Sequence, residues 1–234
     1  MAVLISIPAL GCDAGLHEPV NDLLPAACAV ETHIADADDL AACVTAIIAG
    51  THEPFVVMGT SFGGRVALEA ALAAPDKVRG LIIIGAGAGP SADPAAGFRR
   101  GMRLRNGELE QVAAEMGAII PHLPGPNGPA AREAFIAMMR KQGAELIARQ
   151  SDALAKRGDL WPRLAEIRCP ALMLWGRQDQ FSPVSDGERM ARAIPKGQFA
   201  VIEDCGHFPS LEYPEQTAGI IRRWMDAHQL LNGP

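Results

Sequence analysis

An apolar run that leads into Gly59-Thr60-Ser61-Phe62-Gly63 limits the folds open to this chain more than any other stretch. The four residues before it, 55–58, have the pattern of a buried strand. The residues after it, 62–74, form a small-residue pattern typical of a helix, which Pro75 ends. The turn between them must be sharp, and the two glycines leave room beside its central residue because they carry no Cβ. The sequence therefore predicts a strand, a strained turn and a helix, with the hydroxyl of Ser61 above the sheet.

Apolar runs and helical patterns alternate on both sides of this turn. The expected strands are residues 3–7, 29–34, 55–58, 78–84, 171–175 and 198–202. The expected helices are residues 16–24, 37–49, 62–74, 185–193 and 217–228. Such alternation is typical of an α/β protein whose mostly parallel sheet, here of about six strands, has helices on both faces.

The alternation stops after the fourth strand. Residues 93–164 show only helical patterns, interrupted by a Pro- and Gly-rich turn at 121–129. We therefore expect a core made of residues 1–88 and 166–234, with residues 89–165 inserted as a helical cap. The cap should cover the carboxyl edge of the sheet, where ligands bind in open α/β sheets.

The predicted cap carries many apolar residues at helical spacing. Most should pack inside it, while some, methionines among them, should face the space above Ser61. The cap also holds a basic cluster, formed by Arg99, Arg100, Arg103 and Arg105. For this cluster two interpretations stay open, a solvated helix face and a carboxylate-binding site.

Composition narrows the class of protein. The net charge is −6 at pH 7, which argues against a nucleic-acid partner, and no apolar run reaches membrane-spanning length. The five cysteines are odd in number and contain no C-x-x-C pair, as expected for free thiols in a reducing, cytoplasmic compartment. No cluster of His and Cys has the spacing of metal ligands, so we expect no metal site.

A serine hydroxyl becomes a good nucleophile only when a base removes its proton. The chain has six candidate histidines, at positions 17, 33, 52, 122, 207 and 228. His207 follows the last predicted strand, so it should lie at the same carboxyl edge as Ser61. His122 falls in the predicted cap, where it could touch a substrate. We therefore predict that His207 is the base.

The base works best when an acidic group orients it. Asp179 follows the fifth predicted strand and should also reach the carboxyl edge. The alternatives are Asp186, which should begin a helix, and Asp204, which should shape the loop before His207. The predicted catalytic residues are therefore Ser61, Asp179 and His207, in this order along the chain.

Ser61, Asp179 and His207, in this order and after these strands, resemble the catalytic triad of the α/β-hydrolase superfamily. The resemblance extends over nearly the whole chain and includes Trp175-Gly176 and Gly206-His207. In detail the chain is similar to small capped, esterase-like serine hydrolases whose first loop reads Pro-Gly-Leu-x-Cys-Asp. The loop here is 8–13, Pro8-Ala9-Leu10-Gly11-Cys12-Asp13, in which Pro8-Ala9 replaces the usual His-Gly pair.

The resemblance implies an oxyanion hole made of two backbone N–H groups, those of Leu10 and Phe62. It also implies a serine hydrolase that cleaves short to medium carboxylic esters through an acyl-enzyme, without a cofactor, as a monomer or homodimer. The partner is then a small-molecule ester. Hydrolysis of lactones or of carbon–carbon bonds is the alternative on the same scaffold. A non-catalytic ligand-binding module is the third hypothesis.

Overall fold

The structure is a computed structural model that describes residues 2–51 and 53–231. Its centre is a parallel sheet of six strands in the order β2-β1-β3-β4-β5-β6, which confirms the predicted fold class. The strands are β1 (Ala2–Ile7), β2 (Cys28–Thr32), β3 (Phe55–Thr60), β4 (Val78–Ile84), β5 (Ala171–Gly176) and β6 (Gly197–Ile202). Each lies within two residues of its predicted bounds at the start and at the end.

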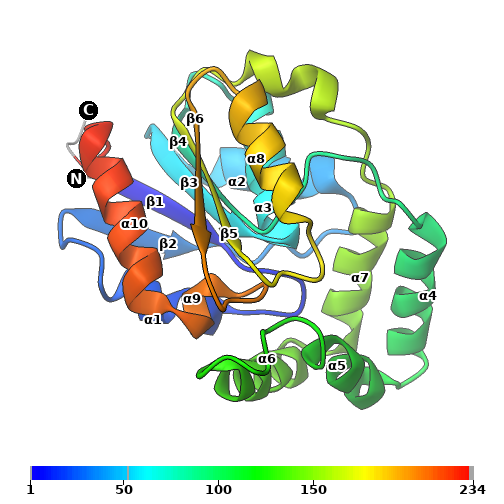
Figure 1. Cartoon of the computed structure of the whole chain (residues 1–234). Helices are drawn as coiled ribbons and strands as arrows, with labels where there is room; N and C mark the ends of the chain where they lie inside the picture. The colour runs from blue at the N-terminus through cyan, green and yellow to red at the C-terminus, as the bar shows by residue number, and fades with distance from the viewer. Residues whose placement is uncertain (1, 52, 232–234) are drawn as a thin grey trace.

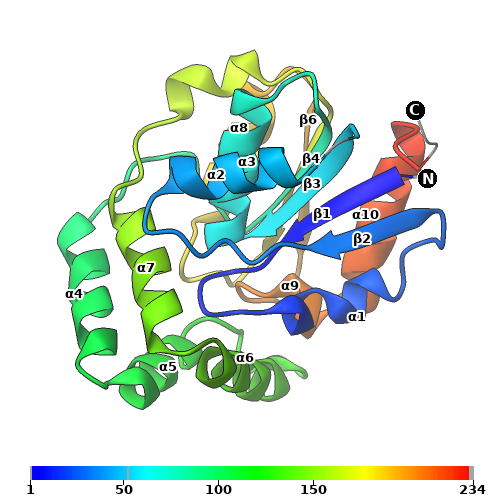
Figure 2. The same cartoon turned by 180° about the vertical axis from the view of Figure 1, so that it is seen from behind.

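The helices cover both faces of this sheet (Figures 1 and 2). One face carries α2 (Leu40–Gly50), α3 (Phe62–Ala73) and α8 (Val184–Ala193). The other carries α1 (Glu18–Asn21), α9 (Pro209–Glu212) and α10 (Pro214–Ala227). Two 3₁₀ turns, η1 (Ala14–Leu16) and η2 (Trp161–Glu166), complete the connections. The arrangement places every loop that follows a strand at one edge of the molecule.

The sheet has a separate hydrophobic core on each face because its central strands are buried on both sides. Leu81 and Ile83 of β4 contribute to the core under α2, α3 and α8. Ile82 and Ile84, which alternate with them, contribute to the core under α10. Such alternation explains why β4 is apolar at nearly every position.

Four helices lie between β4 and β5, in the segment predicted to form the cap. They are α4 (Pro94–Arg105), α5 (Leu109–Gly117), α6 (Gly128–Gln142) and α7 (Ala144–Ala155). Figure 1 shows them beyond the carboxyl ends of the strands, with α4 beside α7. Most of their apolar side chains pack inward, as expected; Leu104, Val112, Phe135 and Ile147 are buried. In the described part of the chain, no helix has the length and hydrophobicity that a membrane span requires.

Candidate active site

Ser61 stands in the turn between β3 and α3 with a strained backbone, φ 54° and ψ −113°. A positive φ is uncommon for a residue with a Cβ and marks strain that the surroundings must hold in place. The two flanking glycines explain how the turn fits. A Cβ on Gly59 would collide with the backbone of Gly63, and one on Gly63 would collide with the carbonyl of Ile7. The predicted geometry of the turn is therefore present.

Asp179 and His207 meet at the same edge of the sheet. Nδ1 of His207 lies 2.7 Å from Oδ2 of Asp179, and both side chains are almost fully buried. The other carboxylate oxygen, Oδ1, accepts the backbone N–H groups of Phe181 and Ser182 at 2.8 and 2.9 Å. These bonds fix the carboxylate, which in turn fixes the imidazole so that its Nε2 atom points away from Asp179.

The two alternative acids do not occupy this position. Asp186 lies in the first turn of α8, as expected. Asp204 is exposed and has a positive φ of 53°, which fits its expected part in shaping the loop. Neither forms a hydrogen bond with His207 among the described residues.

The Nε2 atom of His207 is buried and has no hydrogen-bond partner in the described structure. Two aromatic rings lie near its ring, with centroid distances of 5.3 Å to Phe181 and 5.6 Å to Phe208. Ser61 and His207 line the same cavity. A buried nitrogen without a partner can accept a proton from a group that enters this cavity or from the neighbouring hydroxyl, since such hydrogen bonds often tighten only when substrate is bound.

The first loop brings a second set of donors to the cavity. Leu10 and Phe62 both line it, and neither backbone N–H donates to a described residue. Ala9, at the position of the usual glycine, is not among the described residues with positive φ; Gly11 instead takes that conformation, at φ 72°. The left-handed residue of this loop is therefore Gly11, two positions after the place of the usual glycine.

Gln150 of α7 holds this loop, a contact that sequence reasoning did not find. Its Oε1 accepts the N–H of Gly11 at 2.9 Å, and its Nε2 donates to the carbonyl of Ala35 at 2.8 Å. Gln150 is only 1% exposed, so both bonds are sheltered from water. The segment between β4 and β5 is therefore bonded directly to the residue after Leu10.

Glu212 organises the loop that carries His207, and sequence reasoning missed it as well. Its carboxylate accepts the backbone N–H groups of Gly206 at 2.8 Å, Phe208 at 3.1 Å and His122 at 2.9 Å. Glu212 is 1% exposed. One buried carboxylate thus binds the residues on both sides of His207 and ties them to the helical segment.

A third buried network lies behind Ser61. The ring of His17 bridges two hydroxyls, with Nδ1 2.7 Å from Oγ of Ser6 and Nε2 2.7 Å from Oγ1 of Thr60. Burial lowers the pKa of His17 to about 3, so the ring is neutral. It therefore links β1 to the last residue of β3, immediately before the turn.

The cavity above Ser61 has a volume of about 500 Å³ and takes wall residues from both the sheet edge and the helical segment. Met116 is the one methionine among the described residues that line it. Met138 and Met139 are buried in the core, whereas Met102 is 61% exposed. His122 does not line the cavity either, because it lies beside the His207 loop on the side of Glu212. Polar and charged residues contribute much of the wall.

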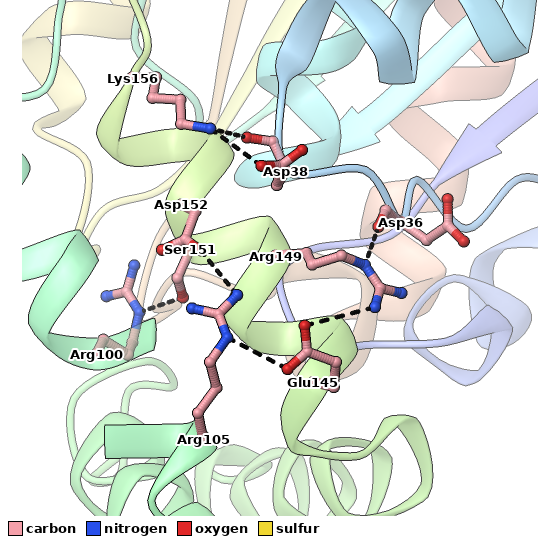
Figure 3. Close-up of polar contacts among 9 residues, drawn as sticks. All are labelled: Asp36, Asp38, Arg100, Arg105, Glu145, Arg149, Ser151, Asp152 and Lys156. Atoms are coloured by element: carbon pink, nitrogen blue, oxygen red, sulfur yellow. Dashed lines mark hydrogen bonds and ion pairs between the residues drawn. The ribbon is translucent and has the colours of Figure 1, made fainter. Parts of the chain in front are cut away.

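The basic cluster divides into two parts. Arg103 pairs with Glu108 and Glu115. Arg105 pairs with Glu145 and Asp152 (Figure 3). Arg99 is likewise exposed and pairs with Asp93. The ion pairs and exposure of these three arginines fit the interpretation of a solvated helix face. Arg100 instead lines the cavity.

The sequence model of the alpha/beta hydrolase family matches residues 3–220 of this chain. The chain belongs to this family. Among solved structures, a thermophilic esterase from Thermogutta terrifontis, studied with malate bound, superposes with a TM-score of 0.88 and is 25% identical; the match covers 97% of this chain and 90% of that one.

Curated alpha/beta hydrolase relatives are similar over shorter spans. A 2-hydroxy-6-oxononadienedioate/2-hydroxy-6-oxononatrienedioate hydrolase from Cupriavidus pinatubonensis is 29% identical over 67% of this chain and 57% of that enzyme. The chain thus spans little more than half the length of such relatives. A pimeloyl-[acyl-carrier protein] methyl ester esterase from Neisseria meningitidis is 27% identical over 80% of this chain and 75% of that enzyme.

Proposed function

We propose that this alpha/beta hydrolase is a serine esterase that cleaves short to medium carboxylic esters. The observation that carries the proposal is the 2.7 Å hydrogen bond between Asp179 and His207, which leaves Nε2 of His207 free beside the cavity that Ser61 lines. The esterases from Thermogutta and Neisseria support ester hydrolysis as the reaction.

In the proposed mechanism, Nε2 of His207 takes the proton of the Ser61 hydroxyl as its oxygen attacks the ester carbonyl. The bond to the alcohol then breaks, and His207 returns the proton to the departing alcohol. The negative oxygen of each tetrahedral intermediate accepts the free N–H groups of Leu10 and Phe62. Water releases the acid from Ser61 by the same route. Asp179 keeps the imidazole oriented and stabilises its charged form.

Residues 89–165 form the cap in this proposal. The cavity wall supports this assignment, because α4, α5 and the end of α7 contribute residues to it. The wall bounds the space for the acyl group. We also propose a cytoplasmic enzyme, because the five cysteines are free thiols, which a reducing compartment maintains.

Two variants and two matched controls test the assignment on 4-nitrophenyl butyrate. Ser61→Ala should remove turnover and labelling by a fluorophosphonate probe while the fold persists. Asp179→Asn should lower kcat by about 10⁴-fold if the imidazole changes tautomer. Asp186→Asn and Asp204→Asn are matched controls that should retain activity. Full activity in Ser61→Ala would refute the proposal, and a large loss in either control with little loss in Asp179→Asn would reassign the acid.

Carbon–carbon bond hydrolysis is the second candidate, and the relative from Cupriavidus is the observation that favours it. Both reactions use a serine and a histidine, so the site geometry does not separate them. Rates measured side by side on aryl esters, lactones and vinylogous diketones do. A kcat/KM for the diketone above that for every ester would favour the second candidate.

A further inference from the structure

Three arginines line the cavity, Arg65, Arg100 and Arg157, and they differ in what they bind. Arg65 is 2% exposed and fully engaged. It donates to Glu69 at 2.8 Å and to the carbonyls of Ala88, Gly89 and Gly158 at 3.1, 3.0 and 2.7 Å. Its charge is paired and its donors are used, so its contribution is to hold the loops around the cavity.

Arg157 has no such partners. Its Nε atom is buried and unpaired, and no described residue accepts a hydrogen bond from its guanidinium. Arg100 donates Nε to Oγ of Ser151 at 2.8 Å, as Figure 3 shows, but its two terminal nitrogens have no acceptor among the described residues. Two half-buried guanidinium groups therefore offer unused donors at the cavity wall.

The charge of these two groups is not balanced on the wall. Asp93 is the one acidic residue among the described residues that line the cavity. It is exposed, and its carboxylate accepts the N–H of Ala96 at 3.0 Å and pairs with Arg99 at 3.0 Å. Burial, with a smaller effect of the charge on Arg157, lowers the pKa of Arg100. Burial and then the charge on Arg65 likewise lower the pKa of Arg157.

Half-buried cations that repel each other and have unused donors cost folding free energy, which an anion between them would offset. A guanidinium presents its N–H groups as a planar fork that matches the two oxygens of a carboxylate. We propose that Arg100 and Arg157 bind a free carboxylate of the substrate, so that the enzyme prefers esters that carry a second, unesterified carboxyl group. This inference rests on the proposed esterase function and specifies its substrate class.

The test compares two esters that differ in one charge. 4-Nitrophenyl hydrogen adipate carries a free carboxylate, and 4-nitrophenyl methyl adipate has the same acyl chain without the charge. The expected kcat/KM is about tenfold or more higher for the charged ester, since a charge-assisted pair in a sheltered site contributes at least that factor. Arg100→Gln and Arg157→Gln should each reduce this ratio by about tenfold.

Two further variants control for charge and for folding. Arg163→Gln removes the same charge from an exposed residue that pairs with Glu166 outside the cavity, and it should leave the ratio unchanged. Arg157→Lys keeps the charge without the fork and should give an intermediate ratio, even if Arg157→Gln does not fold. An equal ratio in Arg157→Gln, Arg157→Lys and the parent enzyme would overturn the inference.

A binding measurement separates this inference from the esterase proposal. Methyl hydrogen adipate should bind the Ser61→Ala protein in calorimetry at least tenfold more tightly than dimethyl adipate. Turnover of both aryl esters without a preference, together with equal binding, would overturn the carboxylate site and leave the esterase proposal intact. Tight binding of the monoacid without turnover of any ester by the parent enzyme would do the reverse.

Discussion

Gly85 packs against the imidazole of His207, and a Cβ on Gly85 would lie 3.0 Å from its Nδ1 atom. The same Cβ would lie 3.1 Å from Oδ2 of Asp179. Gly85 follows the last residue of β4 and has a positive φ of 58°. The absence of a side chain at this position therefore lets the hydrogen-bonded pair sit directly on the end of the central strand.

Gly85→Ala should damage activity more than stability. The left-handed backbone alone costs about 1–2 kcal/mol with a Cβ present, and the crowding adds displacement of the His207 ring. We expect kcat on 4-nitrophenyl butyrate to fall at least tenfold. Gly107→Ala is the matched control, since Gly107 has a φ of 88° and open space where its Cβ would stand. It should lose similar stability in urea denaturation and keep its kcat. Equal kcat values in both variants would contradict the expected crowding.

Glu212→Gln should lower kcat through the loop that carries His207. The amide keeps one acceptor oxygen but turns the other into a donor, which then faces backbone N–H groups. Loss of bonds from buried donors costs about 1–3 kcal/mol. Thermal denaturation should show that loss, and kcat should fall while KM changes little. Glu215→Gln, at an exposed position in the first turn of α10, should change neither quantity. Unchanged kcat in Glu212→Gln would show that the loop holds without this carboxylate.

The protein should lose stability in mild acid because of His17. Its pKa is about 3 when folded, against 6.5 for the ordinary side chain, so between these values only the unfolded chain binds the proton. The free energy of unfolding should therefore fall as the pH falls from about 6.5 toward 3, by up to ~1.4 kcal/mol per pH unit from this residue. Urea denaturation at pH 7.5, 6, 5 and 4 measures it. His17→Gln should be less stable at neutral pH but show a shallower loss; the same slope in both proteins would assign the effect to other groups.

The bounded cavity should limit the acyl chain. Each methylene that enters it contributes at most about 0.8 kcal/mol, and further methylenes meet the wall or solvent. With about 500 Å³ available, kcat/KM for neutral 4-nitrophenyl esters should peak at short to medium acyl groups and fall toward palmitate. A steady rise to palmitate, or a jump in activity on emulsified lipid, would show that the helical segment opens to admit long chains.

Much of the fold followed from the sequence because its signals are local. The apolar runs predicted the buried strands β3 and β4, and the structure has both. The glycines beside Ser61 predicted the sharp turn, which the structure also has. The residues of the segment 89–165 that line the cavity could not be chosen from the sequence, since helical spacing does not reveal which side of a helix faces a cavity. The roles of Glu212 and Gln150 could not be predicted for a different reason. Gln150 binds a residue 139 positions away, and no neighbour in the sequence marks either side chain as buried.

The pair of bonds made by Gln150 has a consequence for movement and for protein engineering. Its amide joins α7 to Gly11, beside the predicted oxyanion donor Leu10, and to Ala35 after β2. Any swing of α7 away from the sheet must break both bonds and release the first loop. In such an open form the cavity could exchange ligands, but the N–H group of Leu10 would no longer be held in place. A chimera that exchanges the helical segment for that of a relative must carry an amide side chain at the position of Gln150. Without it, the N–H group of Gly11 in the first loop would lose its hydrogen bond to α7.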